Sequence, residues 1–84
     1  MGSPKQPITL KAEQVEALSQ KLSLMRHDIN NMLSLMNAAV ELIRTKPDMR
    51  ERMIDTVLEQ SPRITNAIDQ FSSEFRRTLN TVDP

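Results

Sequence analysis

The stretch from about residue 10 to residue 45 contains neither glycine nor proline and consists mainly of good helix formers. Its apolar residues are separated by alternating intervals of three and four, the a/d pattern of a helix packed lengthwise against another. They are Val15, Leu18, Leu22, Met25, Ile29, Met32, Met36, Ala39 and Ile43. Such a helix would be about 50 Å long at 1.5 Å per residue. The pattern therefore predicts one long helix whose apolar stripe has to be covered by a partner helix.

A second helix is predicted from about residue 47 to residue 79, after a break at residues 45–48. Pro47 fits the first turn of a helix, and the acidic Asp48 and Glu51 favour its positive N-terminal end. A second series of a/d positions follows, at Ile54, Val57, Ser61, Ile64, Ile68, Phe71 and Phe75. Because the connection is short, we expect the second helix to run antiparallel to the first.

Pro62 lies inside this second apolar series. It cannot donate a backbone hydrogen bond to the Leu58 carbonyl, so we expect a bend at Pro62 or just before it. Counted from a hairpin tip near Lys46, Pro62 lies opposite about Asn31. The bend is therefore expected within one helical turn of the level of His27.

These features predict an all-α fold, an antiparallel two-helix hairpin that homodimerises into a four-helix bundle. Residues 1–10 are expected to be an irregular lead-in that starts with a tag remnant, residues 11–79 the hairpin (helices at about 10–45 and 47–79), and residues 80–84 a frayed end. The dimer is expected because two helices with wide apolar stripes cannot cover each other completely. A two-fold dimer of hairpins is the simplest closed arrangement that does so.

Composition excludes several functional classes. Eleven basic and 11 acidic residues give a formal net charge of zero, so no strong field attracts nucleic acid or anionic lipid. No apolar run approaches the roughly 20 residues that span a bilayer, so no direct membrane contact is expected. The chain has no cysteine and one histidine, too few ligands for a structural metal site.

The single histidine, His27, lies in the middle of the first predicted helix and is followed directly by Asp28. With Ile29 at position a of the heptad, His27 falls on the solvent side, and Asn31, four residues on, shares its face. An exposed imidazole is mainly neutral and nucleophilic at neutral pH. A neighbouring carboxylate can take its proton or orient its ring, and an amide one turn away can position a water. A surface His beside an Asp is also a common pair without chemistry.

The run from Met25 to Leu33, Met-Arg-His-Asp-Ile-Asn-Asn-Met-Leu, resembles the phosphoacceptor box of sensor histidine kinases. The similarity extends to the whole hairpin, roughly residues 11–79, which looks like the dimerisation and histidine-phosphotransfer domain of that family. The nine-residue box is the specific part of this resemblance, because the hairpin periodicity alone matches many helical bundles.

The resemblance implies that His27 is phosphorylated from ATP by a separate catalytic domain and passes the group to an aspartate of a response-regulator receiver domain. It further implies that Asp28 assists proton removal and that Asn31 positions water for dephosphorylation of the regulator. The chain would then be a fragment of a protein-histidine kinase, inactive alone, without a cofactor of its own. ATP and Mg²⁺ are expected on the partner domains, and the location is expected to be cytoplasmic.

The box departs from its commonest form at two places, since Asn30 replaces an arginine and Met32 replaces a proline. Without a proline after the histidine, we expect Pro62 to supply flexibility from the second helix. Two alternatives stay open. One is a non-catalytic dimerising bundle or scaffold, in which His27 has no chemical role. The other is a stand-alone dimeric phosphotransfer protein without a kinase domain.

Overall fold

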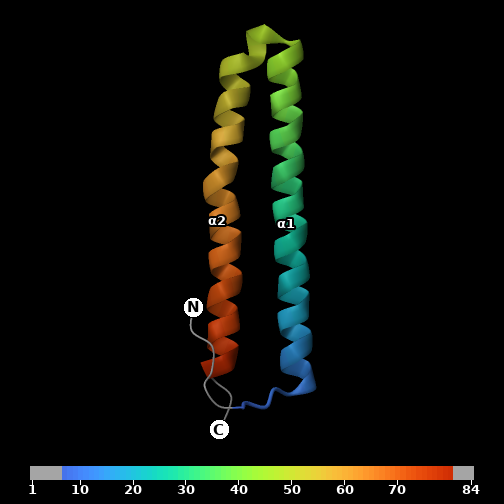
Figure 1. Ribbon diagram of the computed structural model, residues 1–84, viewed down its shortest axis with the longest axis vertical. Helices are drawn as coiled ribbons and strands as arrows, with labels where there is room; N and C mark the ends of the chain where they lie inside the picture. Colours follow the sequence, from blue (N-terminus) through green and yellow to red (C-terminus); the bar gives the residue numbers. More distant parts are fainter. Residues whose placement is uncertain (1–6, 81–84) are drawn as a thin grey trace.

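The computed structural model describes residues 7–80, and the proposed tag remnant and most of the proposed frayed end lie outside that range. Two long helices, α1 (Ala12–Thr45) and α2 (Arg50–Asn80), run side by side in opposite directions. The short 3₁₀ helix η1 (Pro47–Met49) joins them at the tip of the hairpin (Figure 1). The all-α antiparallel hairpin predicted from the sequence is therefore confirmed.

α1 begins two residues later than expected, at Ala12, with Lys11 as its N-cap. The backbone N–H of Lys11 donates to Oε1 of Gln14 at 2.8 Å, so a glutamine side chain folds back over the start of the helix. At the other end, the Lys46 N–H donates to the Leu42 carbonyl at 2.8 Å and closes the last turn. The hydroxyl of Thr45 donates to the Glu41 carbonyl at 2.9 Å.

The connection is as tight as the sequence suggested, but its helix is of a different kind. Pro47 opens the 3₁₀ turn η1, in which the Met49 N–H donates to the Lys46 carbonyl at 3.0 Å. α2 starts only at Arg50 and extends through Asn80, which belongs to the helix and not to a frayed end. The tight turn reverses the chain within a few residues, and this places α2 alongside α1.

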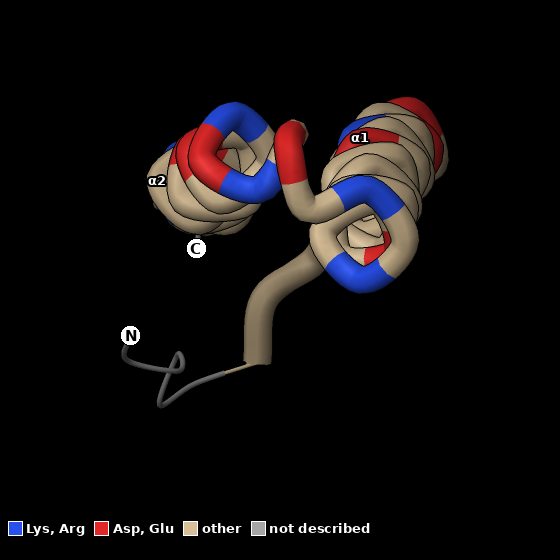
Figure 2. The backbone as a smooth tube through the Cα atoms, turned by 90° about the horizontal axis from the view of Figure 1, so that it is seen from above, with Lys and Arg blue, Asp and Glu red and all other residues tan. Residues whose placement is uncertain are grey.

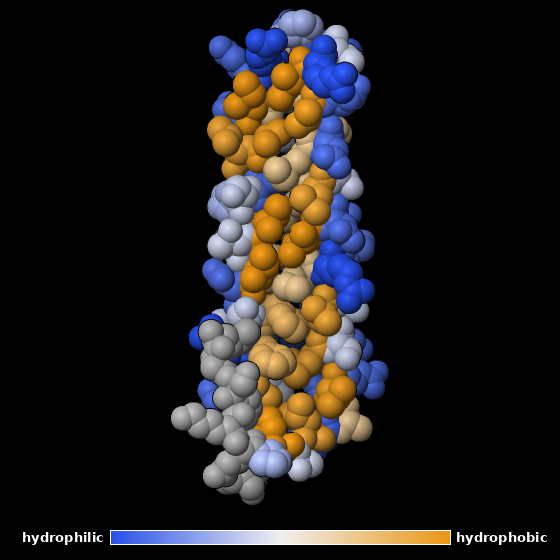
Figure 3. Space-filling view, in the orientation of Figure 1, coloured by the Kyte–Doolittle hydropathy of each residue, from blue (hydrophilic) through white to orange (hydrophobic). Residues whose placement is uncertain are grey.

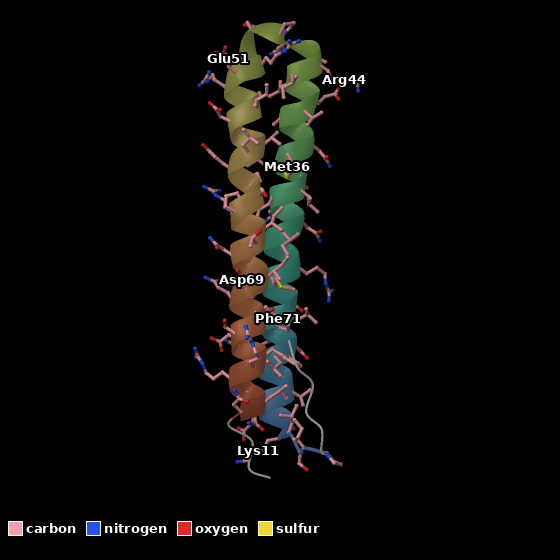
Figure 4. All side chains as sticks on the ribbon, turned by 60° about the vertical axis from the view of Figure 1, so that its left-hand side comes forward. Lys11, Met36, Arg44, Glu51, Asp69 and Phe71 are labelled. Atoms are coloured by element: carbon pink, nitrogen blue, oxygen red, sulfur yellow. The ribbon has the colours of Figure 1, made fainter. Side chains whose placement is uncertain are left out.

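The predicted stripe of α1 faces α2 along most of its length. Ala39 is buried, and six other members of the stripe are half-buried, namely Leu18, Met25, Ile29, Met32, Met36 and Ile43. Met36 of α1 and Phe71 of α2 lie between the two helices, whereas Arg44 and Glu51 point away from the hairpin (Figure 4). Val15 and Leu22 depart from the pattern and are exposed.

α2 is rotated relative to the prediction, because only part of its apolar series faces α1. Val57, Ile64, Phe71 and Phe75 are half-buried as expected, but Ile54, Ser61 and Ile68 are exposed. Their places against α1 are taken by Met53, Gln60 and Ala67, each one residue earlier in the sequence. One residue is 100° of rotation in an α-helix. The apolar series of α2 was predicted to form a single contact with α1. Part of it does so, and the rest lies on a side of α2 that α1 does not cover.

The ion pair between Lys21 and Glu74, with Nζ and Oε2 3.2 Å apart, sets the two helices in register. Counting turns from this pair in the two opposite directions places Pro62 level with Leu33 and His27 level with Ile68. Pro62 is thus six residues from the level of His27, about 9 Å along the axis, and not within one turn as expected. α2 continues as a single helix through Pro62.

Gln60 and Ala39 are the two residues of the described chain that are fully buried, with exposures of 1% and 2%. The Gln60 Nε2 donates to the Thr56 carbonyl at 3.0 Å, so the amide lies one turn closer to the tip. By the register, Thr56 is opposite Ala39, and the small alanine leaves room for the amide. The Gln60 Oε1 is buried without a hydrogen-bond partner among the described residues. Such a group costs about 1–3 kcal/mol.

The hairpin is a rod of 60 × 21 × 14 Å with one apolar side along its whole length (Figure 3). The 3.6-residue period places on this side a set of exposed residues that we call the apolar face. They are Val15, Leu22, Leu33, Val40, Ile54, Leu58 and Ile68. Charged residues of both signs lie on both helices (Figure 2), in keeping with the net charge of zero.

Candidate functional site

His27 lies near the middle of α1, away from both ends of the helix, so its backbone is held by helical hydrogen bonds on either side. Its side chain is 73% exposed, and that of Asp28 is 59% exposed. The exposure predicted from the heptad pattern is therefore found. A rigid helix that presents an accessible imidazole gives a reacting group a fixed position without burying it.

Asp28 and Asn31 both approach the same nitrogen of His27. The Asn31 Nδ2 lies 3.4 Å from the His27 Nδ1, a long hydrogen bond across one helical turn. The Asp28 Oδ1 lies 3.9 Å from the same Nδ1, an ion-pair distance that a small rotation of the carboxylate would shorten. Neither contact involves Nε2. The two nitrogens of the ring thus differ, because both neighbouring side chains approach Nδ1 and these contacts leave Nε2 uninvolved.

This division bears on which tautomer can react. For Nε2 to attack an electrophile, its lone pair has to be free and the ring proton has to sit on Nδ1. The Asp28 carboxylate can then accept that proton's hydrogen bond and stabilise the ring as positive charge develops on it. Turning the Asn31 amide over presents its oxygen to Nδ1 with the same effect. The described side chains can therefore favour the reactive tautomer through a rotation of the Asp28 carboxylate and a flip of the Asn31 amide.

Asp28 also borders a groove between the helices, with a volume of about 600 Å³. The α1 part of this groove comes from the turns around Met25, and the α2 part from residues 66–77. The lining residues are Lys21, Leu24, Met25, Asp28, Asn66, Ala67, Asp69, Gln70, Phe71, Ser73, Glu74 and Arg77. His27 and Asn31 are not among them. The site therefore sits at the edge of the groove, with Asp28 shared between the two.

The α2 residues of the groove were not identified from the sequence. Asn66, Gln70 and Ser73 are ordinary polar positions on a helix, and no motif marks them. Their place near Asp28 depends on the antiparallel register, which a contact such as Lys21–Glu74 fixes and which periodicity alone leaves open. The tight turn after Thr45 was the available signal, because a short connection limits the register to a few choices.

His27 also borders a shallow, open depression on the outer side of α1, lined otherwise by Glu16, Ser19, Gln20, Ser23 and Leu24. Apart from Leu24, these residues have small or polar side chains, and the imidazole beside them is largely exposed. Within residues 7–80, no group of three His, Cys, Asp or Glu side chains could hold a metal ion. The histidine thus borders this depression on the outer side of α1 and is accessible there.

Two further observations frame this site. Neither helix of the described chain combines the length and apolar character needed to cross a membrane. Comparison with protein-family models, curated proteins and solved structures found no match for this chain. Its function is therefore inferred from the residues around His27 and from the hairpin that carries them.

Proposed function

We propose that this chain is the dimerisation and phosphoacceptor domain of a sensor histidine kinase, with His27 as the acceptor. The observation that carries the proposal is an exposed imidazole whose Nδ1 is approached by both Asp28 and Asn31, in contacts that leave Nε2 uninvolved. The box from Met25 to Leu33 and the two-helix hairpin, which resemble those of the family, support it further.

In the proposed reaction, Nε2 of neutral His27 attacks the γ-phosphorus of ATP held by a separate catalytic domain. A P–N bond forms, the bond from phosphorus to the ADP oxygen breaks, and ADP leaves with the electron pair. Asp28 accepts a hydrogen bond from Nδ1–H and stabilises the positive charge on the ring, then takes up the proton or releases it to water. The resulting phosphoramidate is labile and suits onward transfer to an aspartate of a receiver domain.

Asn31 has a different proposed role, the dephosphorylation of the receiver domain. Its amide lies one helical turn from the imidazole, on the same side of α1. An amide there can orient a water toward the phosphorus of an acyl phosphate brought to the site by a partner. In this proposal ATP and Mg²⁺ are held by the partner domains, as the resemblance to the family implies. We place the reaction in the cytoplasm, where ATP and receiver domains meet it.

The proposal includes a homodimer in which two hairpins form a four-helix bundle. The apolar face defined above runs along the whole hairpin, and its seven side chains are 37–65% exposed. The whole 84-residue chain has an accessible surface of 6739 Å². A compact monomer of 9.6 kDa would expose about 5,100 Å². The excess is in the range of a stable protein interface, which a second copy would supply.

His27 is at position f of the heptad, five residues from Leu22 of the apolar face, which places it about 140° around α1 from that residue. A dimer formed through the apolar face would therefore leave both copies of His27 accessible. The apolar face, which the dimer would cover, and His27, which would stay accessible, occupy different sides of α1. This separation is what a dimeric phosphoacceptor requires.

The test is phosphate transfer from γ-labelled ATP to the full chain, in the presence of Mg²⁺ and the ATP-binding domain of the same kinase. We expect a label that is stable in alkali and lost in acid, as a phosphohistidine is. The variant His27→Gln should carry no label, and the control variant Asn37→Ala, an exposed residue of α1 away from the site, should carry as much as the wild type.

A label that survives in His27→Gln would contradict the proposal, and so would the absence of label in a folded wild-type chain. The second result favours a non-catalytic scaffold, in which the apolar face is the functional feature. A third result would favour the stand-alone phosphotransfer protein instead. In that case His27 takes its label from a phosphorylated receiver domain, and no kinase domain is encoded beside the hairpin.

A further inference from the structure

The middle of α2 lacks stabilising hydrogen bonds at two adjacent places. Pro62 has no N–H, so the Leu58 carbonyl loses the helical donor that any other residue would provide. Two residues earlier, the Gln60 Oε1 is buried and has no hydrogen-bond partner within residues 7–80. Each defect weakens a helix locally. Their coincidence within five residues distinguishes this segment from the rest of α2.

The polar groups at this level bond to their own helix and not across the hairpin. The Gln60 Nε2 donates to the Thr56 carbonyl, and the Thr56 hydroxyl donates to the Arg52 carbonyl at 3.1 Å. Ala39, opposite Thr56 by the register, offers only a methyl group. Neither of these two hydrogen bonds joins α1 to α2, although Gln60 and Ala39 at this layer are fully buried.

On either side of this layer the helices are better held together. Toward the tip, half-buried Met53 and Val57 pack against α1, and the tight turn η1 fixes the chain. Toward the other end, Lys21 and Glu74 join the helices, and the rings of Phe71 and Phe75, four residues apart on α2, lie 6.1 Å apart and stabilise α2 itself. This ring separation is within the range of favourable aromatic pairs. The weak layer thus separates two firmer parts of the hairpin.

We propose that residues 58–62 of α2 form a hinge that divides the hairpin into a tip half and a half that carries His27. Opening of the hinge costs little, because the Leu58 carbonyl has already lost its helical bond and the Gln60 oxygen gains water when exposed. His27 and the Asp28 groove lie beyond the hinge, level with Ile68 and the residues around it. Bending at the hinge would therefore change the separation of the helices at the groove. The hinge itself does not depend on the proposed function.

The hinge can be tested on the full chain by residue-resolved amide hydrogen exchange under native conditions. Amides of residues 59–61 and 63–66 should exchange at least about tenfold faster than those of residues 52–57 and 68–75. Gln60→Leu, which removes the unpaired amide, and Pro62→Ala, which restores a backbone donor, should each slow this exchange. Both substitutions favour the helix, so the variants are expected to fold.

Two exposed neighbours on the same helix serve as matched controls. Gln70→Leu repeats the change of side chain without a buried amide, and Arg63→Ala places an alanine beside Pro62 without restoring a donor. Both should leave the fast exchange at residues 59–66 unchanged. A uniform exchange rate along α2 in the wild type would overturn the hinge. So would fast exchange that persists in the double variant Gln60→Leu/Pro62→Ala.

Discussion

At the scale of single residues, the chemistry of this chain is concentrated in one turn of α1. His27 is the only histidine, and the two side chains that approach its Nδ1 come from positions one and four residues further on. Both neighbours act through local helical geometry, so their placement needs no tertiary contact. For the same reason these residues were accessible to prediction, whereas their chemical roles remain proposals that require partner domains.

The role of Asn31 gives a prediction that separates the two proposed activities. In Asn31→Ala, dephosphorylation of a phosphorylated receiver domain should slow at least about tenfold, because the amide that orients the water is lost. Labelling of His27 should stay within about threefold of the wild type, since Nε2 and Asp28 are unchanged. Phosphate release from the receiver domain and labelling from ATP measure the two rates.

The adjacent exposed residue provides the control for this experiment. Asn30→Ala makes the same chemical change one position earlier, 100° away around the helix, and should leave both rates near those of the wild type. Equal loss in Asn30→Ala and Asn31→Ala, or no loss in either, would remove the specific role given to Asn31.

At the scale of the helices, the main finding is that α2 presents a different face to α1 than its apolar series suggested. Gln60 replaces the expected Ser61 against α1, and Ile54 and Ile68 turn to the uncovered side. A helix with a wide apolar stripe can rotate by one residue and still bury apolar surface. The choice is made by fit against α1, and at the most buried layer that fit pairs a large Gln60 with a small Ala39.

This pairing predicts that enlarging Ala39 is costly. Ala39→Leu should destabilise the folded chain by about 1–3 kcal/mol, because the extra carbons would occupy the space filled by the Gln60 amide. Ala38→Leu adds the same atoms at the neighbouring exposed position and should change stability by less than about 0.5 kcal/mol. Urea unfolding at one protein concentration compares the two variants. Equal effects would mean that the Ala39 layer is not tightly packed.

At the scale of the whole molecule, the hairpin does not build a closed core by itself. Two residues are buried within the described chain, and one of them is polar. The radius of gyration is 18.3 Å, against about 12 Å for a compact domain of this length. Covering this exposed apolar surface would stabilise the rod. The apolar face runs along the full length of the hairpin, so a second hairpin could pack against it from end to end.

The proposed dimer predicts a particle of about 19 kDa by light scattering, twice the 9.6 kDa of the chain. The double variant Leu33→Glu/Ile54→Glu should weaken the dimer at least a hundredfold. Each substitution occurs twice in a two-fold dimer and removes about 1.5–3 kcal/mol of apolar burial per copy. Size-exclusion chromatography with light scattering at micromolar concentration measures this.

Leu24→Glu is the matched control, since Leu24 is 63% exposed but lies on the groove side of α1 and not on the apolar face. This variant should remain dimeric. A wild-type chain that stays monomeric at micromolar concentration would rule out the four-helix bundle, and equal dissociation by all variants would mean that the apolar face is not the interface.

The sequence alone determined the two helices, their antiparallel order and the exposure of His27, because these follow from local propensity, apolar period and a short turn. It also brought Asn31 to the imidazole, since residues four apart share a helical face in any tertiary setting, and it made Asp28 the next residue along the chain. The tertiary structure decided the rotation of α2, the burial of Gln60, the groove beside Asp28 and the level of Pro62. Each of these depends on how two nearly equivalent faces fit together, and apolar period does not specify that fit, because several rotations bury similar areas.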